Sequence, residues 1–560
     1  MAENYPDPTK IEQEGLASTP AEKSGTLTVY WLLLGLVILF IAFVRIRLLS
    51  TPLERDEGEY AYMGQLLLKG YAPFAKAYNM KLPGTSMMYA LSMSIFGQTT
   101  VGVHLGFLLV NVGTILMLFV GIRRLFNPLT AFVASSTFAL LTLSPALLGL
   151  AAHATHFVVF YAVAGLLVLQ RALTREKKTL LLFASGLLLG ASVLMKQPGA
   201  AFALIALLAV TYHRGLVARV SLLETLKSVS AVAIGVLVPL LLLLAWLHSA
   251  GVFDRFWFWT FEYGSQYASA VGWYEGKMYL ESFFRSTFGQ NGGLWSFAIA
   301  GALTLGFSGF ESHRKVFVIA IVLISFLAVC PGFYFREHYF VLFAPAVGLL
   351  AGIGADFIRN RIVAGWSTGW PSWLAVGMFM IASAAGVVRL RSYYLEYSPE
   401  EVANKRYRGN AFTESVRVAD YIRQHTNKED RIAVLGSEPQ IYFYADRLSA
   451  TGYIYTYSLM EPQPYNGRMQ AEMIEEIEAS KPEMVALCRF PFSWLASSEA
   501  PQTIFEWSDR YIRANYFLVG VVEVARVDAE AAYFWDEEAR RHRPGSDRVI
   551  FVFKRHNGGA

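Results

Sequence analysis

Long apolar runs recur through the first 390 residues of this chain and constrain its fold more than any other feature. A helix needs about 20 mostly apolar residues to cross the hydrocarbon core of a bilayer. Such runs are expected over 27–48, 101–122, 128–148, 152–170, 179–195, 198–213, 228–249, 293–310, 315–330, 337–357 and 371–390. Only 16% of the residues are charged, against roughly 25% in soluble domains. The sequence therefore predicts a polytopic α-helical membrane protein with about 11–13 transmembrane helices.

Lysine and arginine are distributed unevenly between the loops that join these runs. If residues 1–26 form a cytoplasmic tail, the cytoplasmic loops hold most of the basic residues, among them Arg123 and Arg124. The short outer loops hold only Lys196 and Arg336. This is the positive-inside pattern. It predicts that the transmembrane domain, residues 27–392, has two long extracytoplasmic loops at 49–100 and 250–292.

Residues 393–560 are more charged than the rest and follow a different pattern. Helical patterns at 413–426 and 469–480 alternate with the short apolar runs "RIAVLG", "EMVALC", "YFLVGVVEV" and "VIFVFK". This alternation is typical of a small α/β domain, and the topology places it on the extracytoplasmic side. A single glycine, Gly436, follows the first of these runs without a glycine-rich loop, which favours a docking or acceptor-handling domain over a nucleotide site.

Two global features exclude other classes of protein. The net charge of +5 is small for 560 residues and follows the membrane topology, so it does not indicate a nucleic-acid partner. The two cysteines, Cys330 and Cys488, lie far apart in unlike surroundings, which argues against a disulfide framework or a thiolate metal cage.

The stretch "LERDEGEYAYMGQLLLKGYAPFAKAYNMKLPG" follows the first apolar run and carries the most suggestive chemistry. One interpretation is structural: Asp56 caps a helix, and Glu57 lies in its first turn and complements the helix dipole. The functional interpretation adds Lys81, which returns a cation to the same outer surface. A carboxylate and a lysine near the lipid headgroups suit a transfer reaction, because the carboxylate accepts a proton while the cation stabilises a departing lipid phosphate.

The same stretch resembles the first outer loop of the GT-C superfamily of membrane glycosyltransferases. The resemblance is to the branch of protein O-mannosyltransferases and lipid A aminoarabinose transferases, which are glycosyltransferase family 39-like proteins. The residues that match in order and spacing are Asp56-Glu57, Tyr60-Ala61, and Lys81 with Pro83. Glu59 stands where the aminoarabinose transferases tend to carry an arginine, and Leu82 replaces the first proline of the turn.

The resemblance implies a GT-C fold and an inverting transfer of a hexosyl or pentosyl group from a polyprenyl-phosphate donor. The acceptor would be a protein, a lipid or a surface glycan outside a bacterial inner membrane. Asp56 would be the base and Glu57 its neighbour, while Lys81 and Tyr60 would bind substrate. No cofactor is required under this interpretation, although a carboxylate pair can also bind a divalent cation. The alternative is a carrier or flippase that binds the same lipid without cleaving it.

Three further groups are candidates for the outer surface. Arg336 and His338, in "PGFYFREHYF", begin a span and are candidates for substrate binding, with membrane anchoring as the alternative. Lys196, in "LMKQPGA", is either an anchor or another cation near the lipid phosphate. His153 and His156 are three residues apart, a spacing that permits a metal but lacks a third ligand, so no metal site is predicted.

Overall fold

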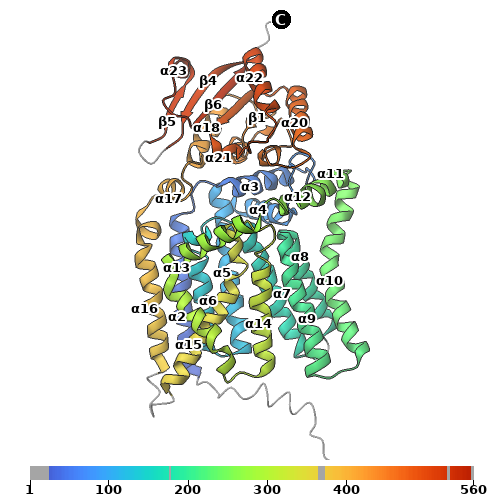
Figure 1. Cartoon of the computed structure of the whole chain (residues 1–560), viewed down its shortest axis with the longest axis vertical. Helices are drawn as coiled ribbons and strands as arrows, with labels where there is room; N and C mark the ends of the chain where they lie inside the picture. Colours follow the sequence, from blue (N-terminus) through green and yellow to red (C-terminus); the bar gives the residue numbers. More distant parts are fainter. Residues whose placement is uncertain (1–23, 176–177, 364–371, 526–529, 557–560) are drawn as a thin grey trace, which may run out of the picture.

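The computed structural model describes residues 24–175, 178–363, 372–525 and 530–556. Most of the expected cytoplasmic tail, residues 1–23, lies outside the described part. Figure 1 shows three layers: a helical bundle, a thin layer that contains α3 and α4, and a sheet domain at the opposite end from the bundle. This order of layers places the first outer loop between the bundle and the sheet domain.

The bundle contains a helix for each of the apolar runs. These helices are α2 (Ser24–Arg47), α5 (Thr100–Leu125), α6 (Pro128–Leu141), α7 (Ala154–Leu173), α8 (Thr179–Met195), α9 (Ala200–Tyr212), α10 (Leu222–Ser249), α13 (Trp273–Thr304), α14 (Ser312–Leu327), α15 (Ala344–Val363) and α16 (Ser372–Arg389). Within the described residues, five helices are long and apolar enough to cross a membrane, and three shorter apolar helices accompany them. The prediction of a polytopic helical membrane domain is confirmed.

Three predicted boundaries differ from the structure. The run 128–148 stops being helical at Leu141, before the short turn η1 (Pro145–Leu147). The run 337–357 begins with the 3-10 turn η6 (Glu337–Val341), and α15 starts only at Ala344. Helix α13 begins almost two thirds of its length before the predicted span and bends at Asn291, whose φ of −125° is not helical. Hydrophobicity alone missed the first two boundaries because apolar residues continue into the turns. It missed the start of α13 because that part of the helix contains charged residues such as Glu275 and Lys277.

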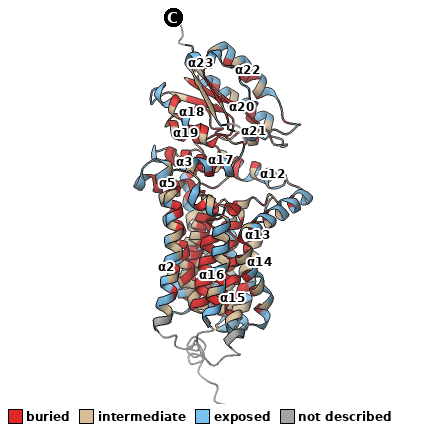
Figure 2. Cartoon of the chain, turned by 90° about the vertical axis from the view of Figure 1, so that its left-hand side faces the viewer, coloured by how far each residue is buried: buried red, intermediate tan, exposed pale blue. Residues whose placement is uncertain are grey.

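The bundle packs through small residues. Figure 2 shows buried positions concentrated inside the bundle and exposed ones on its outer face. Between α8 and α10, a Cβ at Gly186 would lie 2.2 Å from the Val232 carbonyl oxygen, and a Cβ at Gly235 would lie 2.3 Å from that of Phe183. Such close backbone approach is a common way for membrane helices to associate, because lipid tails and side chains are equally apolar.

The layer above the bundle is built from the two long outer loops and short connections. It contains α3 (Arg55–Leu68), α4 (Gly84–Phe96), α11 (Phe253–Trp257), η4 (Phe258–Tyr263), α12 (Gly264–Ala268) and η6, and α17 (Pro399–Arg406) leads out of it. In Figures 1 and 2, α3 lies directly below the sheet domain. The run "GTSMMYALSMSIF" is the helix α4, too short to span a bilayer, as expected.

The C-terminal domain is an α/β domain, as predicted. Its strands are β1 (Arg431–Leu435), β2 (Leu448–Ser449), β3 (Met484–Arg489), β4 (Tyr516–Glu523), β5 (Ala532–Trp535) and β6 (Val549–Arg555). They form one sheet in the order β2-β1-β3-β6-β4-β5. The first three strands are parallel, and β6, β4 and β5 pair antiparallel.

The helices of this domain are α18 (Phe412–Gln424), α19 (Gln440–Ala445), η8 (Tyr457–Leu459), α20 (Asn466–Ser480), α21 (Pro491–Trp494), α22 (Thr503–Asn515) and α23 (Asp536–Arg541). Helices α18 and α20 and strands β1, β3, β4 and β6 correspond to the predicted elements. Strands β2 and β5 were not predicted, because segments of two and four residues give too little periodicity to detect.

Candidate active site

The start of α3 exposes a single side chain. The helix is capped by Glu54, whose carboxylate accepts a hydrogen bond of 2.9 Å from the Glu57 backbone N–H. Asp56 is therefore not the cap that the structural interpretation predicted. Every residue from Thr51 to Leu66 is buried except Asp56, whose side chain is 19% exposed. Local folding thus presents one carboxylate of this acidic stretch to an incoming ligand.

Lys81 contacts Asp56, as the sequence predicted for residues that return to the same surface. Its ammonium lies 3.1 Å from Asp56 Oδ1 and 2.8 Å from Glu59 Oε2. It also lies 4.8 Å from the ring centre of Tyr60, a side chain that is almost fully buried. Glu59 was not predicted at the site, because the resemblance suggests an arginine at that position. One lysine therefore bridges two carboxylates above an aromatic ring.

The two carboxylates respond differently to their surroundings. Burial alone would raise the pKa of Asp56, but attraction by Lys81, followed by His153 and Lys196, holds that pKa well below its usual range. For Glu59, burial and the charge of Asp56 outweigh the attraction of Lys81, so its pKa is raised. Asp56 is consequently the carboxylate that stays ionised at this site.

Two imidazoles face the second oxygen of Asp56. His153 Nδ1 lies 3.9 Å and His338 Nε2 lies 4.0 Å from Asp56 Oδ2. The two rings stack with their centres 4.0 Å apart. Burial lowers the pKa of His153 to about 4. Both nitrogens of His153 are buried without a hydrogen-bond partner among the described residues.

This triad also groups the atoms that a metal ion would need. One ligand atom from each of Asp56, His153 and His338 lies within 4.8 Å of the others. A carboxylate with two imidazoles is a donor set that suits Zn²⁺. Ligand atoms around one tetrahedral ion would stand about 3.3 Å apart, so the triad would have to contract to hold it. His156 lies elsewhere, packed against Phe107 with ring centres 4.6 Å apart.

Glu57 is fixed inside the protein. Its Oε1 accepts hydrogen bonds from the Ala152 backbone N–H at 2.6 Å and pairs with His104 Nε2 at 3.1 Å. The side chain is only 3% exposed. Burial would raise the pKa of Glu57, but His104 and the Ala152 N–H lower it. Glu57 therefore connects the start of α3 to α5 and to the turn before α7, and it does not reach the accessible surface.

Lys196 and Arg336 approach the same surface from short connections at the end of the bundle. The Lys196 ammonium lies 4.0 Å from the ring centre of Tyr339, and Arg336 lies over Tyr334 at 5.6 Å. Burial lowers the pKa of Lys196, which is also close enough to Asp56 to stabilise its carboxylate. Within the described residues, neither cation has a carboxylate at ion-pair distance. Both have unused capacity to bind an anion.

The C-terminal domain holds the first residue of α3. The Arg55 guanidinium donates to the Ser437 carbonyl at 2.5 Å, to Glu438 Oε1 at 2.8 Å and to Asn410 Oδ1 at 3.0 Å. The Arg55 and Glu438 side chains are only 10% and 0% exposed. Close backbone approach accompanies this pair, because a Cβ on Gly58 would lie 2.6 Å from Gln440 Cβ. The residue next to Asp56 is thus buried between the two domains.

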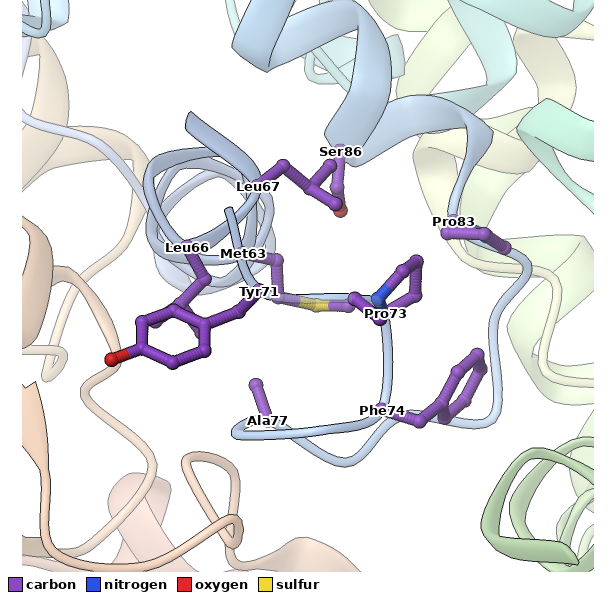
Figure 3. A pocket seen from close by; sticks show the side chains of 10 residues that line it. Met63, Leu66, Leu67, Tyr71, Pro73, Phe74, Ala77, Pro83 and Ser86 are labelled. Atoms are coloured by element: carbon purple, nitrogen blue, oxygen red, sulfur yellow. The ribbon is translucent and has the colours of Figure 1, made fainter. Parts of the chain in front are cut away.

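Two hollows lie outside the site. A space of about 10 Å³ lies within the first outer loop, lined mainly by apolar side chains such as Met63, Phe74 and Pro83 (Figure 3). It has room for about one water molecule. A wider groove of about 730 Å³ lies at the carboxyl end of β3 beside Arg489 and Trp494. Neither includes Asp56, which lies instead on the accessible surface between the two domains.

Comparison with known proteins agrees with this architecture. The family model described as dolichyl-phosphate-mannose-protein mannosyltransferase matches residues 81–247. No curated protein matches the chain in sequence. The solved structure of ArnT from Cupriavidus metallidurans bound to undecaprenyl phosphate is similar, with a TM-score of 0.57 and 14% identity. The alignment covers 95% of this chain and 98% of that one.

A second similar structure is the oligosaccharyltransferase AglB from Archaeoglobus fulgidus in complex with an inhibitory peptide and a dolichol-phosphate. Its TM-score is 0.51 at 12% identity, covering 94% of this chain and 76% of that one. The same oligosaccharyltransferase in complex with Zn and sulfate gives a TM-score of 0.51 at 13% identity, over 93% and 74% of the two chains. These findings confirm the predicted resemblance: the chain has the fold of the GT-C superfamily of membrane glycosyltransferases.

Proposed function

We propose that this protein is a glycosyltransferase that moves a sugar from a polyprenyl-phosphate donor to an acceptor hydroxyl. The observation that carries the proposal is the environment of Asp56. It is the one accessible carboxylate at the start of α3, with Oδ1 bound to Lys81 and Oδ2 without a hydrogen bond from any described residue. Lys196 and Arg336, both without carboxylate partners in the described chain, complete an anion-binding surface beside it.

These residues suit a single in-line displacement. The acceptor oxygen attacks the anomeric carbon, and the bond from that carbon to the phosphate oxygen breaks. The electron pair leaves with the polyprenyl phosphate, whose added negative charge Lys196, Arg336 and Lys81 stabilise. Asp56 Oδ2 accepts the proton of the acceptor hydroxyl. Attack opposite the leaving group inverts the configuration at the anomeric carbon.

The other predicted residues have supporting parts in this proposal. Glu57 holds the start of α3 through Ala152 and His104, and the Tyr60 ring packs beneath Lys81. His338 and His153 flank the open oxygen of Asp56. If a divalent cation binds, Asp56, His153 and His338 would hold it, and it would supply positive charge. Lys81 already supplies positive charge to Asp56, so the proposed reaction requires no metal.

The proposal places the reaction on the extracytoplasmic side of a bacterial inner membrane. Helix α5 begins beside the C-terminal domain, where Thr100 Oγ1 lies 3.4 Å from the Tyr444 hydroxyl, and it ends in Arg123 and Arg124. This basic end is therefore remote from Asp56. The positive-inside pattern then puts Asp56 and the C-terminal domain outside, where a protein, lipid or glycan acceptor would be met.

The deciding experiment is mass spectrometry of surface glycans and glycoproteins from cells that express wild-type protein, Asp56→Asn or Asp254→Asn. Asp254 is an exposed carboxylate on α11 and is the matched control. We expect Asp56→Asn to abolish at least one glycan species that the wild type and the control both produce. A complete, unchanged glycan inventory in Asp56→Asn would refute transfer. A carrier that only binds the lipid would also tolerate this substitution.

A further inference from the structure

We infer that Tyr455, a residue of the C-terminal domain, contacts the acceptor in the active site and positions its hydroxyl for Asp56. This inference rests on the proposed function and names the part of the molecule that handles the second substrate. Tyr455 lies more than 370 residues after Lys81 in the sequence, yet its ring centre is 5.9 Å from the Lys81 ammonium. The membrane domain alone therefore forms an incomplete site.

The backbone around Tyr455 is tied to the first outer loop. The Tyr78 backbone N–H donates to the Gly452 carbonyl at 2.8 Å, and the Ser449 backbone N–H donates to the Tyr62 hydroxyl at 2.8 Å. A Cβ at Gly452 would lie 2.1 Å from the Tyr78 ring, so only glycine permits this contact. The segment that carries Tyr455 is thus tied to the first outer loop, which also carries Lys81, by two contacts that lie three and six residues before Tyr455.

Tyr455 differs from the two tyrosines that flank it at alternate positions. The Tyr453 hydroxyl donates to Glu472 at 2.7 Å, and the Tyr457 hydroxyl donates to the Phe492 carbonyl at 2.5 Å. The Tyr455 hydroxyl has no hydrogen-bond partner among the described residues, and its side chain is only partly buried. Burial, together with the nearby Asp56 carboxylate, raises the pKa of Tyr455. The phenol therefore stays protonated and free to donate a hydrogen bond to a ligand.

The direction from which Tyr455 reaches the site indicates which substrate it contacts. Lys196 and Arg336 come from connections at the end of the bundle, where a lipid-linked phosphate arrives from the membrane. Tyr455 belongs to the sheet domain, between β2 and η8, and Figure 1 shows that domain on the other side of α3 from the bundle. An acceptor hydroxyl must reach Asp56 Oδ2 from the side that the donor does not occupy. The phenol ring and its free hydroxyl then give the acceptor a packing surface and a hydrogen bond.

The test separates acceptor handling from donor binding in the full-length protein. Tyr455→Ala, Tyr455→Phe and the control Tyr457→Phe are compared with the wild type at limiting expression, where product is proportional to enzyme level. Product is the glycan species lost in Asp56→Asn, measured by mass spectrometry in cells. Donor-site binding is measured on purified protein with undecaprenyl phosphate as the probe, and melting temperature reports folding.

We expect Tyr455→Ala to lower product at least tenfold and Tyr455→Phe a few-fold, with the undecaprenyl phosphate Kd within twofold of wild type. Tyr457→Phe should leave both readouts unchanged. Unchanged product in Tyr455→Ala overturns the inference, as does a rise in Kd equal to the loss of product. If Tyr455→Ala unfolds, Tyr455→Phe decides by the same two readouts. Failure of the proposed function is distinct, because Asp56→Asn would then change no glycan species.

Discussion

Two regions next to Asp56 contain basic side chains that differ in whether a carboxylate pairs with them. At the join between α3 and the C-terminal domain, Arg55 is enclosed by Glu438, Ser437 and Asn410. On the other side, Lys196 and Arg336 lie over the rings of Tyr339 and Tyr334, and neither has a carboxylate at ion-pair distance in the described part of the chain. A buried cation that is paired with an anion holds two parts of a protein together, whereas one that lacks an anion is available to bind one. Basic residues thus hold the two domains together in one region and, under the proposed function, bind the donor phosphate in the other.

The largest effect is expected at the join. Glu438→Gln leaves Arg55 buried without its anion, which should lower the free energy of unfolding by about 3–5 kcal/mol. Thermal and denaturant unfolding of the purified protein measure this loss. Asp446→Asn breaks the exposed pair with Lys69 and should cost at most about 1 kcal/mol. Equal losses in the two variants would contradict the contrast, and Arg55→Met combined with Glu438→Met should recover most of the stability.

The second-largest effect is expected on the affinity for undecaprenyl phosphate when Lys196 or Arg336 is replaced. Lys196→Ala and Arg336→Ala should each weaken binding of undecaprenyl phosphate by about 10- to 150-fold, because each removes a charge-assisted hydrogen bond worth about 1.5–3 kcal/mol. Melting temperature should change little, since neither side chain holds an ion pair in the described chain. Fluorescence or calorimetric titration measures the Kd. Lys69→Ala is the control, and the same weakening in that variant would remove the distinction between the two regions.

A smaller effect is expected in the pH dependence. Lys81 lowers the pKa of Asp56, so the carboxylate is already ionised above its unfolded pKa of about 3.9 and loses its charge only as pH falls below that value. Wild-type transfer should therefore show no loss from Asp56 between about pH 5 and 7. Lys81→Met should raise the acid limb by about 1–3 pH units. Product formation in membrane vesicles measures the profile, and an unmoved limb would show that Lys81 does not govern Asp56.

The smallest effect is expected on removing metal ions. Lys81 already supplies a positive charge to Asp56. The rate of transfer in vesicles treated with EDTA should therefore stay within about twofold of the rate in untreated vesicles, which corresponds to a minor electrostatic contribution. Parallel assays with added Mn²⁺ or Zn²⁺ provide the comparison. A tenfold loss that either ion restores would instead assign Asp56, His153 and His338 to a cation, and would make the two imidazoles ligands rather than neighbours of the base.

The sequence was sufficient for the fold and for the contact between Asp56 and Lys81. Apolar runs and alternating patterns gave the membrane helices and the α/β domain, because both signals are periodic and local. Asp56 and Lys81 were paired correctly since one loop of 25 residues joins them. Arg55 and Glu438 are 383 residues apart, and no spacing rule relates them. Tyr455 was missed for the same reason.

The separate roles of the adjacent residues Asp56 and Glu57 could not be predicted from the sequence, for a different reason. Successive residues on a helix point about 100° apart, so Asp56 and Glu57 face different surroundings even though the sequence gives them equal weight. The structure directs Glu57 to His104 and leaves Asp56 partly accessible. Their roles could not be separated before the neighbours of α3 were known, and the assignment of Asp56 as the base stays a prediction.

The join between α3 and the C-terminal domain also affects the order of events during biosynthesis. Helix α3 is made early, whereas Ser437, Glu438 and Tyr455 leave the ribosome only near the end of synthesis. Domains generally fold as units as the chain emerges. The partly made protein therefore has Asp56 and Lys81 in place without their partners from the last domain. The proposed site becomes complete only when the final domain has folded against α3, so an unfinished chain lacks both Tyr455 and the C-terminal partners of Arg55.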